Sequence, residues 1–157
     1  MENLISKEQV LQLAFGDGEY ISPEVLTDFD IAAAEERYIR PIVGRKLMEA
    51  IFAGDYTELL DDYIAPALAM AVRTMVQSAL NVRTGQCGLS IASSYRSDTS
   101  TKSAIVALNI SLTKRRRTLL KRLSNYLKTN ASRYPEYDEQ SDALQKCSLD
   151  GGFVQVY

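Results

Sequence analysis

Apolar residues recur along most of this chain at the three- and four-residue spacing of an amphipathic helix, and only the last few residues alternate. Two stretches are long enough for helices of many turns. The first runs from Thr57 to Arg83, is the most apolar part of the chain, and predicts a core helix with Pro66 in its first turn. The second runs from Ala104 to about Ala131 and carries its apolar residues along one face.

Shorter helices are predicted in the first third of the chain. Ser6 to Phe15 predicts one of them, because Ser6 and Gln9 have the spacing of a capping box. A second helical pattern starts at Ser22-Pro23-Glu24 or restarts at Asp28, and it continues through Ile39.

A break is expected after this second helix. Pro41 lacks an amide donor and disfavours helical geometry at Arg40, so the helix should end there. Gly44 follows, and Arg45 to Ala53 predicts another short helix that is closed by Gly54.

The remaining segments lack helical periodicity. Residues 90–103 contain eight Ser or Thr, so 85–103 predicts a long loop or a poorly paired hairpin, in which Leu89 to Tyr95 could form a strand. The alternation in Phe153 to Tyr157 suits a short C-terminal strand. The predicted fold class is therefore mainly α, a bundle of four to six helices. A single helical domain is expected over residues 1–135, followed by an acidic tail over residues 136–157.

Composition excludes several kinds of protein. The chain has 157 residues, no histidine, and two cysteines, Cys87 and Cys147, that form no metal-binding or disulfide pattern, so neither a metal nor a cofactor is expected. The N-terminus lacks the basic start and apolar run of a signal peptide, and Pro66 and Arg73 interrupt the most apolar stretch before it could span a membrane. A cytoplasmic protein without membrane contact is expected.

Charge is distributed very unevenly along the chain. Residues 1–66 hold 14 acidic and 5 basic side chains, whereas residues 99–135 hold 9 basic and no acidic ones. Such asymmetry implies a partner for the basic segment. That partner could be the acidic third of the same chain, the acidic third of a neighbouring copy, or a polyanion.

The densest basic run is TKRRRTLLKRL at residues 113–123. On a helical wheel of about 100° per residue, its cations encircle the helix, and Arg116 falls inside the apolar stripe. The run also lacks interleaved aromatic residues on which single-stranded bases could stack. We consider three interpretations: a solvated helix whose arginines pair with nearby acids, a contact with a neighbouring protein, and direct contact with nucleic acid. The candidate assembly or DNA-facing residues are Arg115, Arg116, Arg117, Lys121 and Arg122.

Arg116 is the most informative member of this run. A guanidinium on an apolar face is costly unless it is paired, so Arg116 is expected to meet a carboxylate from the acidic third or from another subunit. The candidate acidic counterparts are Glu35, Glu36, Asp61 and Asp62.

Catalysis is not expected. The adjacent carboxylates point about 100° apart on a helix, so neither pair converges naturally on one substrate. There is no nucleophile elbow, phosphate-binding loop or glycine-rich fingerprint, and no catalytic residue is assigned. Nine of the thirteen aromatic residues are tyrosine, which is common at protein interfaces.

One layout of motifs is similar to a known family. The segment AEERYIRPIVG at residues 34–44, then Leu47, then LLDDY at residues 59–63 and a long apolar helix, resembles small head–tail connector (head-completion) proteins of tailed phages and prophages. The helix, the Pro-x-x-Gly break and the following helix match best. The resemblance covers roughly residues 20–130 and leaves residues 136–157 outside.

This resemblance implies a non-enzymatic structural protein that oligomerises in a ring between portal and tail proteins, with DNA passing through the lumen. The acidic segment 1–66, with a net charge of −9, and the basic segment 99–135, with a net charge of +9, could then attract one another between adjacent copies, with DNA at most a transient contact. Such a protein would be cytoplasmic in the host cell and later part of the virion. The alternative is a helical nucleic-acid-binding module that uses the basic helix at residues 114–122.

Overall fold

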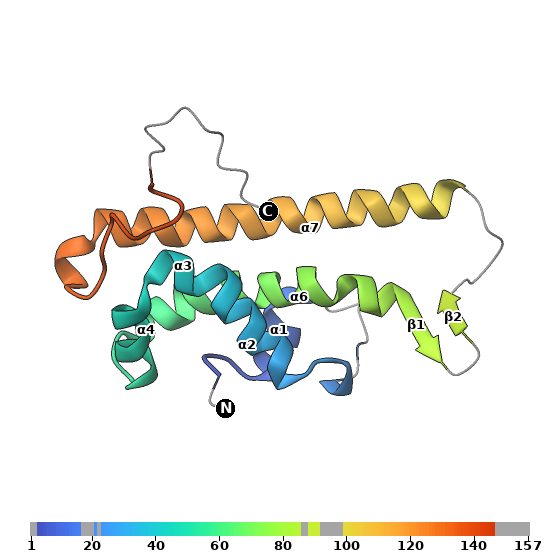
Figure 1. Ribbon diagram of the computed structural model, residues 1–157, viewed down its shortest axis with the longest axis horizontal. Coiled ribbons are helices and arrows are strands. Elements are labelled where there is room, and N and C mark those ends of the chain that lie inside the picture. The colour runs from blue at the N-terminus through green and yellow to red at the C-terminus, as the bar shows by residue number, and fades with distance from the viewer. Residues whose placement is uncertain (1–2, 17–20, 22, 86–87, 92–98, 147–157) are drawn as a thin grey trace.

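The computed structural model describes residues 3–16, 21, 23–85, 88–91 and 99–146 of the chain. It is mainly α-helical, which confirms the predicted fold class (Figure 1). Within the described part, the α- and π-helical segments join into five continuous bodies: residues 7–14, 28–43, 45–52, 57–81 and 99–129. One small hairpin follows the fourth body. The predicted C-terminal strand at Phe153 to Tyr157 lies outside the described residues.

The first two α-helices both begin at a capping box. Helix α1, Lys7–Ala14, has the full capping box, because Ser6 Oγ accepts from the Gln9 amide while Gln9 Oε1 accepts from the Ser6 amide. A 3₁₀ turn at Pro23–Val25 precedes helix α2, Asp28–Ala34. Thr27 caps α2 together with Asp30, so the helix begins at Asp28, the second of the two predicted starts.

The predicted break at Pro41 is wrong. The chain passes from α2 through a π-helical turn, Glu35–Ile39, directly into helix α3, Arg40–Val43. The Arg40 amide donates to the carbonyl of Glu35, five residues back, and this wider turn relieves the clash that a proline ring causes in a regular helix. The helix ends instead at Gly44, whose φ of 79° and ψ of 164° suit glycine alone.

The same device recurs before the second proline. Helix α5, Thr57–Leu59, continues through a π-helical turn, Leu60–Ile64, into helix α6, Ala65–Asn81. Pro66 therefore lies inside a continuous helical body. The prediction that it stands in the first turn is wrong. Both prolines stand in the same four-residue pattern, Tyr-Ile-x-Pro, at residues 38–41 and 63–66.

Helix α6 lies in the middle of the fold (Figure 1). Helices α1 and α2 pack on one side of it, and the 31-residue helix α7, Thr99–Thr129, packs along the other. Helix α4, Arg45–Phe52, follows Gly44 and buries three apolar side chains. The core runs through all of these elements, and the fully buried residues of α6 include three alanines: Ala67, Ala69 and Ala71.

The segment between the two long helices begins as a hairpin. Strand β1, Val82–Gly85, pairs antiparallel with strand β2, Gly88–Ile91, with Val82 opposite Ile91. A hairpin is therefore present, but it begins at Val82, before the predicted segment 85–103 and inside the stretch predicted as helix up to Arg83. Helix α7 starts at Thr99, five residues earlier than its apolar pattern suggested.

The chain after α7 folds back along the helical bundle. A short 3₁₀ turn, Ala131–Arg133, leads into a segment in which Tyr134, Tyr137 and Asp142 are buried. The Ala143 amide donates to the Pro41 carbonyl at 2.9 Å. Residues 136–146 thus pack on the same core as residues before the expected domain boundary at 135.

Candidate functional site

Helix α7 has two parts with very different surroundings. From Leu112 onward one face is buried in the core, and the buried side chains there are Leu112, Arg116, Leu120, Leu123, Ser124 and Leu127. Before Leu112, the described side chains are almost all exposed, including Val106 at 56% and Ile110 at 51%. The basic run lies where the two parts meet.

Arg116 does lie on the packed face, but its partner is not a carboxylate. Its side chain is 6% exposed, its Nη1 donates to Tyr38 Oη at 3.0 Å, and its guanidinium lies 4.5 Å from the centre of the Tyr38 ring. Its Nε has no hydrogen-bond partner among the described atoms. Burial, with a further contribution from Arg117 and Arg37, lowers the pKa of Arg116. The expected intrachain carboxylate partner is therefore wrong, and a tyrosine takes that place.

Arg122, six residues further along and itself exposed, also lies over a tyrosine ring. Its guanidinium lies 4.7 Å from the centre of the Tyr63 ring. Tyr38 and Tyr63 are the tyrosines of the two Tyr-Ile-x-Pro patterns, each at a π-helical turn. This repeated pattern is the sequence signal that could have identified both aromatic partners.

The remaining cations of the run are exposed, as Arg122 is. Arg115, Arg117 and Lys121 are exposed, as is Lys114. Of the five candidate basic residues only Arg116 is buried, and the outer surface carries the other four: Arg115, Arg117, Lys121 and Arg122.

The four candidate acidic counterparts do not contact the basic run in this chain. Glu36 accepts from Arg40 Nη1, which lies one turn along the same helical body. Asp61 and Asp62 are exposed on the second π-helical turn. Glu35 is buried and lines a cavity.

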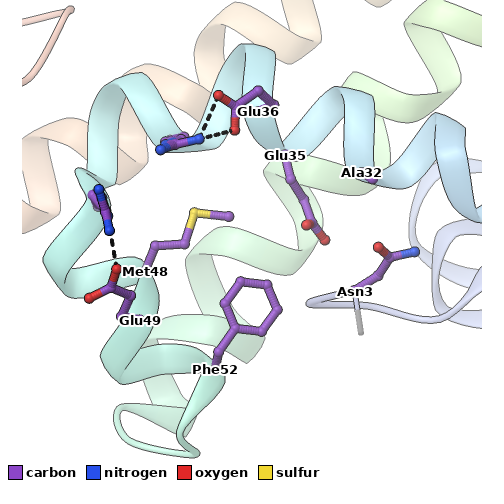
Figure 2. A pocket seen from close by; sticks show the side chains of 9 residues that line it. Asn3, Ala32, Glu35, Glu36, Met48, Glu49 and Phe52 are labelled. Atoms are coloured by element: carbon purple, nitrogen blue, oxygen red, sulfur yellow. Dashed lines mark hydrogen bonds and ion pairs between the residues drawn. The ribbon is translucent and has the colours of Figure 1, made fainter. Parts of the chain in front are cut away.

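This Glu35 cavity has a volume of about 470 Å³ and lies between the α2 body and α4 (Figure 2). Glu35 is 6% exposed, accepts from the Leu4 amide at 2.7 Å, and points into the space between Asn3, Met48 and Phe52. Burial raises the pKa of Glu35, and the Leu4 amide opposes that change. Two ion pairs edge the cavity, Glu36 with Arg40 and Arg45 with Glu49. The lining residues are Asn3, Ala32, Glu35, Glu36, Arg40, Arg45, Met48, Glu49 and Phe52.

A fully satisfied polar cluster, which the sequence did not indicate, holds the far end of α7. Asp142 is fully buried and accepts from Ser124 Oγ at 2.6 Å, from Tyr137 Oη at 2.8 Å and from the Leu144 amide at 2.8 Å. Burial and the bond to Asp142 raise the pKa of Tyr137. No local pattern distinguishes Asp142 from its exposed acidic neighbours, so only the fold reveals its role.

Stacked tyrosines lie beside this cluster. Tyr63 and Tyr126 stack with ring centres 3.8 Å apart, and Tyr56 meets Tyr134 edge to face at 5.0 Å. Burial, followed by the hydroxyl of Tyr126, raises the pKa of Tyr134 to about 12. Several of the many tyrosines therefore serve to hold the C-terminal segment on the bundle.

Among the residues that the structure describes, no cluster of three or more Cys, Asp or Glu side chains could hold a metal ion. In the same residues, no helix combines the length and apolar character needed to cross a bilayer.

Comparison with protein families gives one match. Residues 30–144, more than half of the chain, match a family of unknown function (DUF6712), and the chain belongs to that family. The matched region begins in α2 and ends in the segment that covers the far end of α7. No curated protein and no solved structure matches the chain significantly.

Proposed function

We propose that this member of the DUF6712 family is a non-enzymatic structural protein that assembles with copies of itself, as a head–tail connector of a tailed phage or prophage does. Its partners would be further copies of the chain and the portal and tail proteins on either side of the ring. It would be found in the host cytoplasm and then in the virion. The proposal rests on one surface of the molecule and on the resemblance of residues 20–130 to connector proteins.

The observation that carries the proposal is the exposed first part of α7. Val106, Leu108 and Ile110 are large apolar side chains left exposed to solvent within five consecutive residues of the helix. A helix of this length gains most of its stability from packing, and a single bundle leaves these turns uncovered. Burial of this stretch against another chain would remove apolar area from water, which favours association.

The basic run fits an assembly surface better than a dedicated DNA-binding surface. Arg116 is buried against the Tyr38 ring and is not presented to a phosphate backbone, whereas the exposed Arg122 lies against the Tyr63 ring. The exposed cations continue the outer surface of α7 beyond the apolar residues. Matched charges across an interface fix its register more than they add affinity.

Native mass spectrometry of the purified chain tests the proposal, at low and moderate salt and with and without a short DNA duplex. A closed oligomer of many copies without DNA is expected. A monomer that ignores DNA under all of these conditions contradicts self-assembly through α7.

The alternative function, a nucleic-acid-binding module, is favoured by the exposure of Lys114, Arg115 and Lys121. It predicts a monomer that binds duplex DNA with a steep salt dependence, a slope of about −0.9 for each neutralised phosphate. The same salt series therefore separates the two functions.

A further inference from the structure

The exposed side chains of α7 form a continuous stripe. Val106, Ile110, Lys114, Arg117 and Lys121 follow one another at spacings of four, four, three and four residues. On a regular helix these positions lie within about 80° of each other. All five are exposed, so the α7 stripe is apolar in its first half and basic in its second.

A surface of complementary character lies beside Glu35. The Glu35 cavity has apolar walls from Ala32, Met48 and Phe52, and Phe52 is 41% exposed. Its most buried charged group is Glu35, whose hydrogen-bond partner among the described residues is the amide of Leu4. The acids at the rim, Glu36 and Glu49, already have basic partners. Among the residues that the structure describes, Glu35 is thus the lining carboxylate without a cationic partner.

A lysine side chain matches this cavity in both chemistry and shape. Its methylene stem packs against apolar walls while its ammonium group reaches a carboxylate. Ionised Glu35 is costly to bury alone, and a cation brought close to it would offset that cost. Ile110 stands one turn before Lys114 on the stripe and could cover Met48 and Phe52.

We propose, on the basis of the assembly function above, that the α7 stripe of one copy docks into the Glu35 cavity of the next. Lys114 then pairs with Glu35, and Ile110 packs on the apolar walls. The occupant is a second copy of this chain, because the same sequence carries both complementary surfaces.

The positions of the two surfaces make this contact head to tail. Helix α7 lies along one edge of the molecule, whereas α4 and the start of α2 lie on the other side of α6 (Figure 1). Each copy carries one α7 stripe and one Glu35 cavity. A contact between two copies therefore leaves a free cavity on one of them and a free stripe on the other, and both can bind further copies. Such heterologous contacts close into rings or extend into filaments.

Two complementary variants test the proposal. A stripe variant, Ile110→Ser with Lys114→Glu, keeps the cavity intact. A cavity variant, Glu35→Gln with Phe52→Ser, keeps the stripe intact, and its glutamine can still accept from the Leu4 amide. Each variant alone should be monomeric where the wild type is oligomeric, with association weakened about 100-fold or more. An equimolar mixture should form a dimer and nothing larger, because only one intact contact can be made.

Arg115→Glu is the matched control. It carries the same charge change as Lys114→Glu on the neighbouring residue, about 100° away on the helix, and should leave the oligomer intact. Ala32→Phe, which fills the cavity from α2, should act as the cavity variant does and replaces it if that variant does not fold. Masses would be read by light scattering after gel filtration, with circular dichroism confirming the helical fold.

The outcomes separate this inference from the proposed function. If the wild type is oligomeric and either double variant retains its mass, assembly stands and this interface is wrong. A mixture that stays monomeric, or that rebuilds the full oligomer, also overturns the inference. A wild type that remains monomeric contradicts the assembly function itself.

Discussion

The two parts of helix α7 belong to one regular element, but one has a buried face and the other is exposed to solvent. The part after Leu112 is covered by α6, by the two π-helical turns and by the C-terminal segment. The part before it leaves Val106 and Ile110 in solvent. A helix is continued past its core only if the extra turns are stabilised in another way. One part therefore builds the fold, and the exposure of the other supports the proposal that it is an assembly surface.

The buried polar groups at the packed end are expected to contribute strongly to stability. Asp142→Ala removes the acceptor for Ser124, Tyr137 and the Leu144 amide in a site without water access. We expect the free energy of unfolding to fall by about 3 kcal/mol, since each buried donor left unpaired is costly. Urea denaturation measures this change.

Glu139→Ala is the control for this variant. Glu139 is an exposed acid that pairs with Lys128, and its loss should cost less than about 1 kcal/mol. A loss below about 1 kcal/mol for Asp142→Ala as well would show that the packed end is not held by this cluster.

The buried contact between Arg116 and Tyr38 should contribute little net stability to the fold. Tyr38→Phe leaves the guanidinium buried without its hydroxyl partner and should cost about 1–2 kcal/mol. Arg116→Met, in the wild-type background, removes the buried charge itself and should change the free energy of unfolding by less than about 1 kcal/mol. Thermal and urea unfolding of the two variants would check this order. The reverse order would point to a carboxylate near Arg116 in solution.

Glu35 should make stability depend on pH. Because burial raises its pKa above the ordinary value of 4.5, the folded chain holds this proton more tightly than the unfolded chain does. The stability that Glu35 contributes is therefore complete below pH 4.5 and is lost as pH rises through the raised pKa. Glu35→Gln should gain stability relative to the wild type over this range, measured by urea unfolding of dilute protein at several pH values. A constant difference between the two proteins would contradict a raised pKa.

The exposed part of α7 should show the smallest effect on monomer stability. Val106→Asn with Ile110→Asn should change the free energy of unfolding of dilute protein by less than about 0.5 kcal/mol, because these side chains are not packed. Leu112→Ala, on the same helix but buried, should cost about 2–5 kcal/mol. Equal costs for the two would remove the distinction between the parts of α7.

Much of the fold follows from local pattern, and much of the site does not. The capping box at Ser6 and the helix after Gly44 depend on neighbouring residues and could be predicted. The π-helical turn before Pro41 could not, since proline normally ends a helix and the wider turn that rescues it has no established local rule. The helical wheel placed Arg116 on the packed face. Its partner Tyr38 lies 78 residues away, and an acid was the chemically simpler expectation.

The central claim, that the first part of α7 is an assembly surface, is tested most directly by hydrogen exchange. Backbone amides would be followed in dilute and in concentrated protein, with the oligomeric state measured in parallel. We predict that the amides of residues 102–111 exchange more slowly on assembly, while those of residues 120–129 are protected equally in both states. An oligomer in which residues 102–111 exchange as fast as in the monomer would contradict the claim.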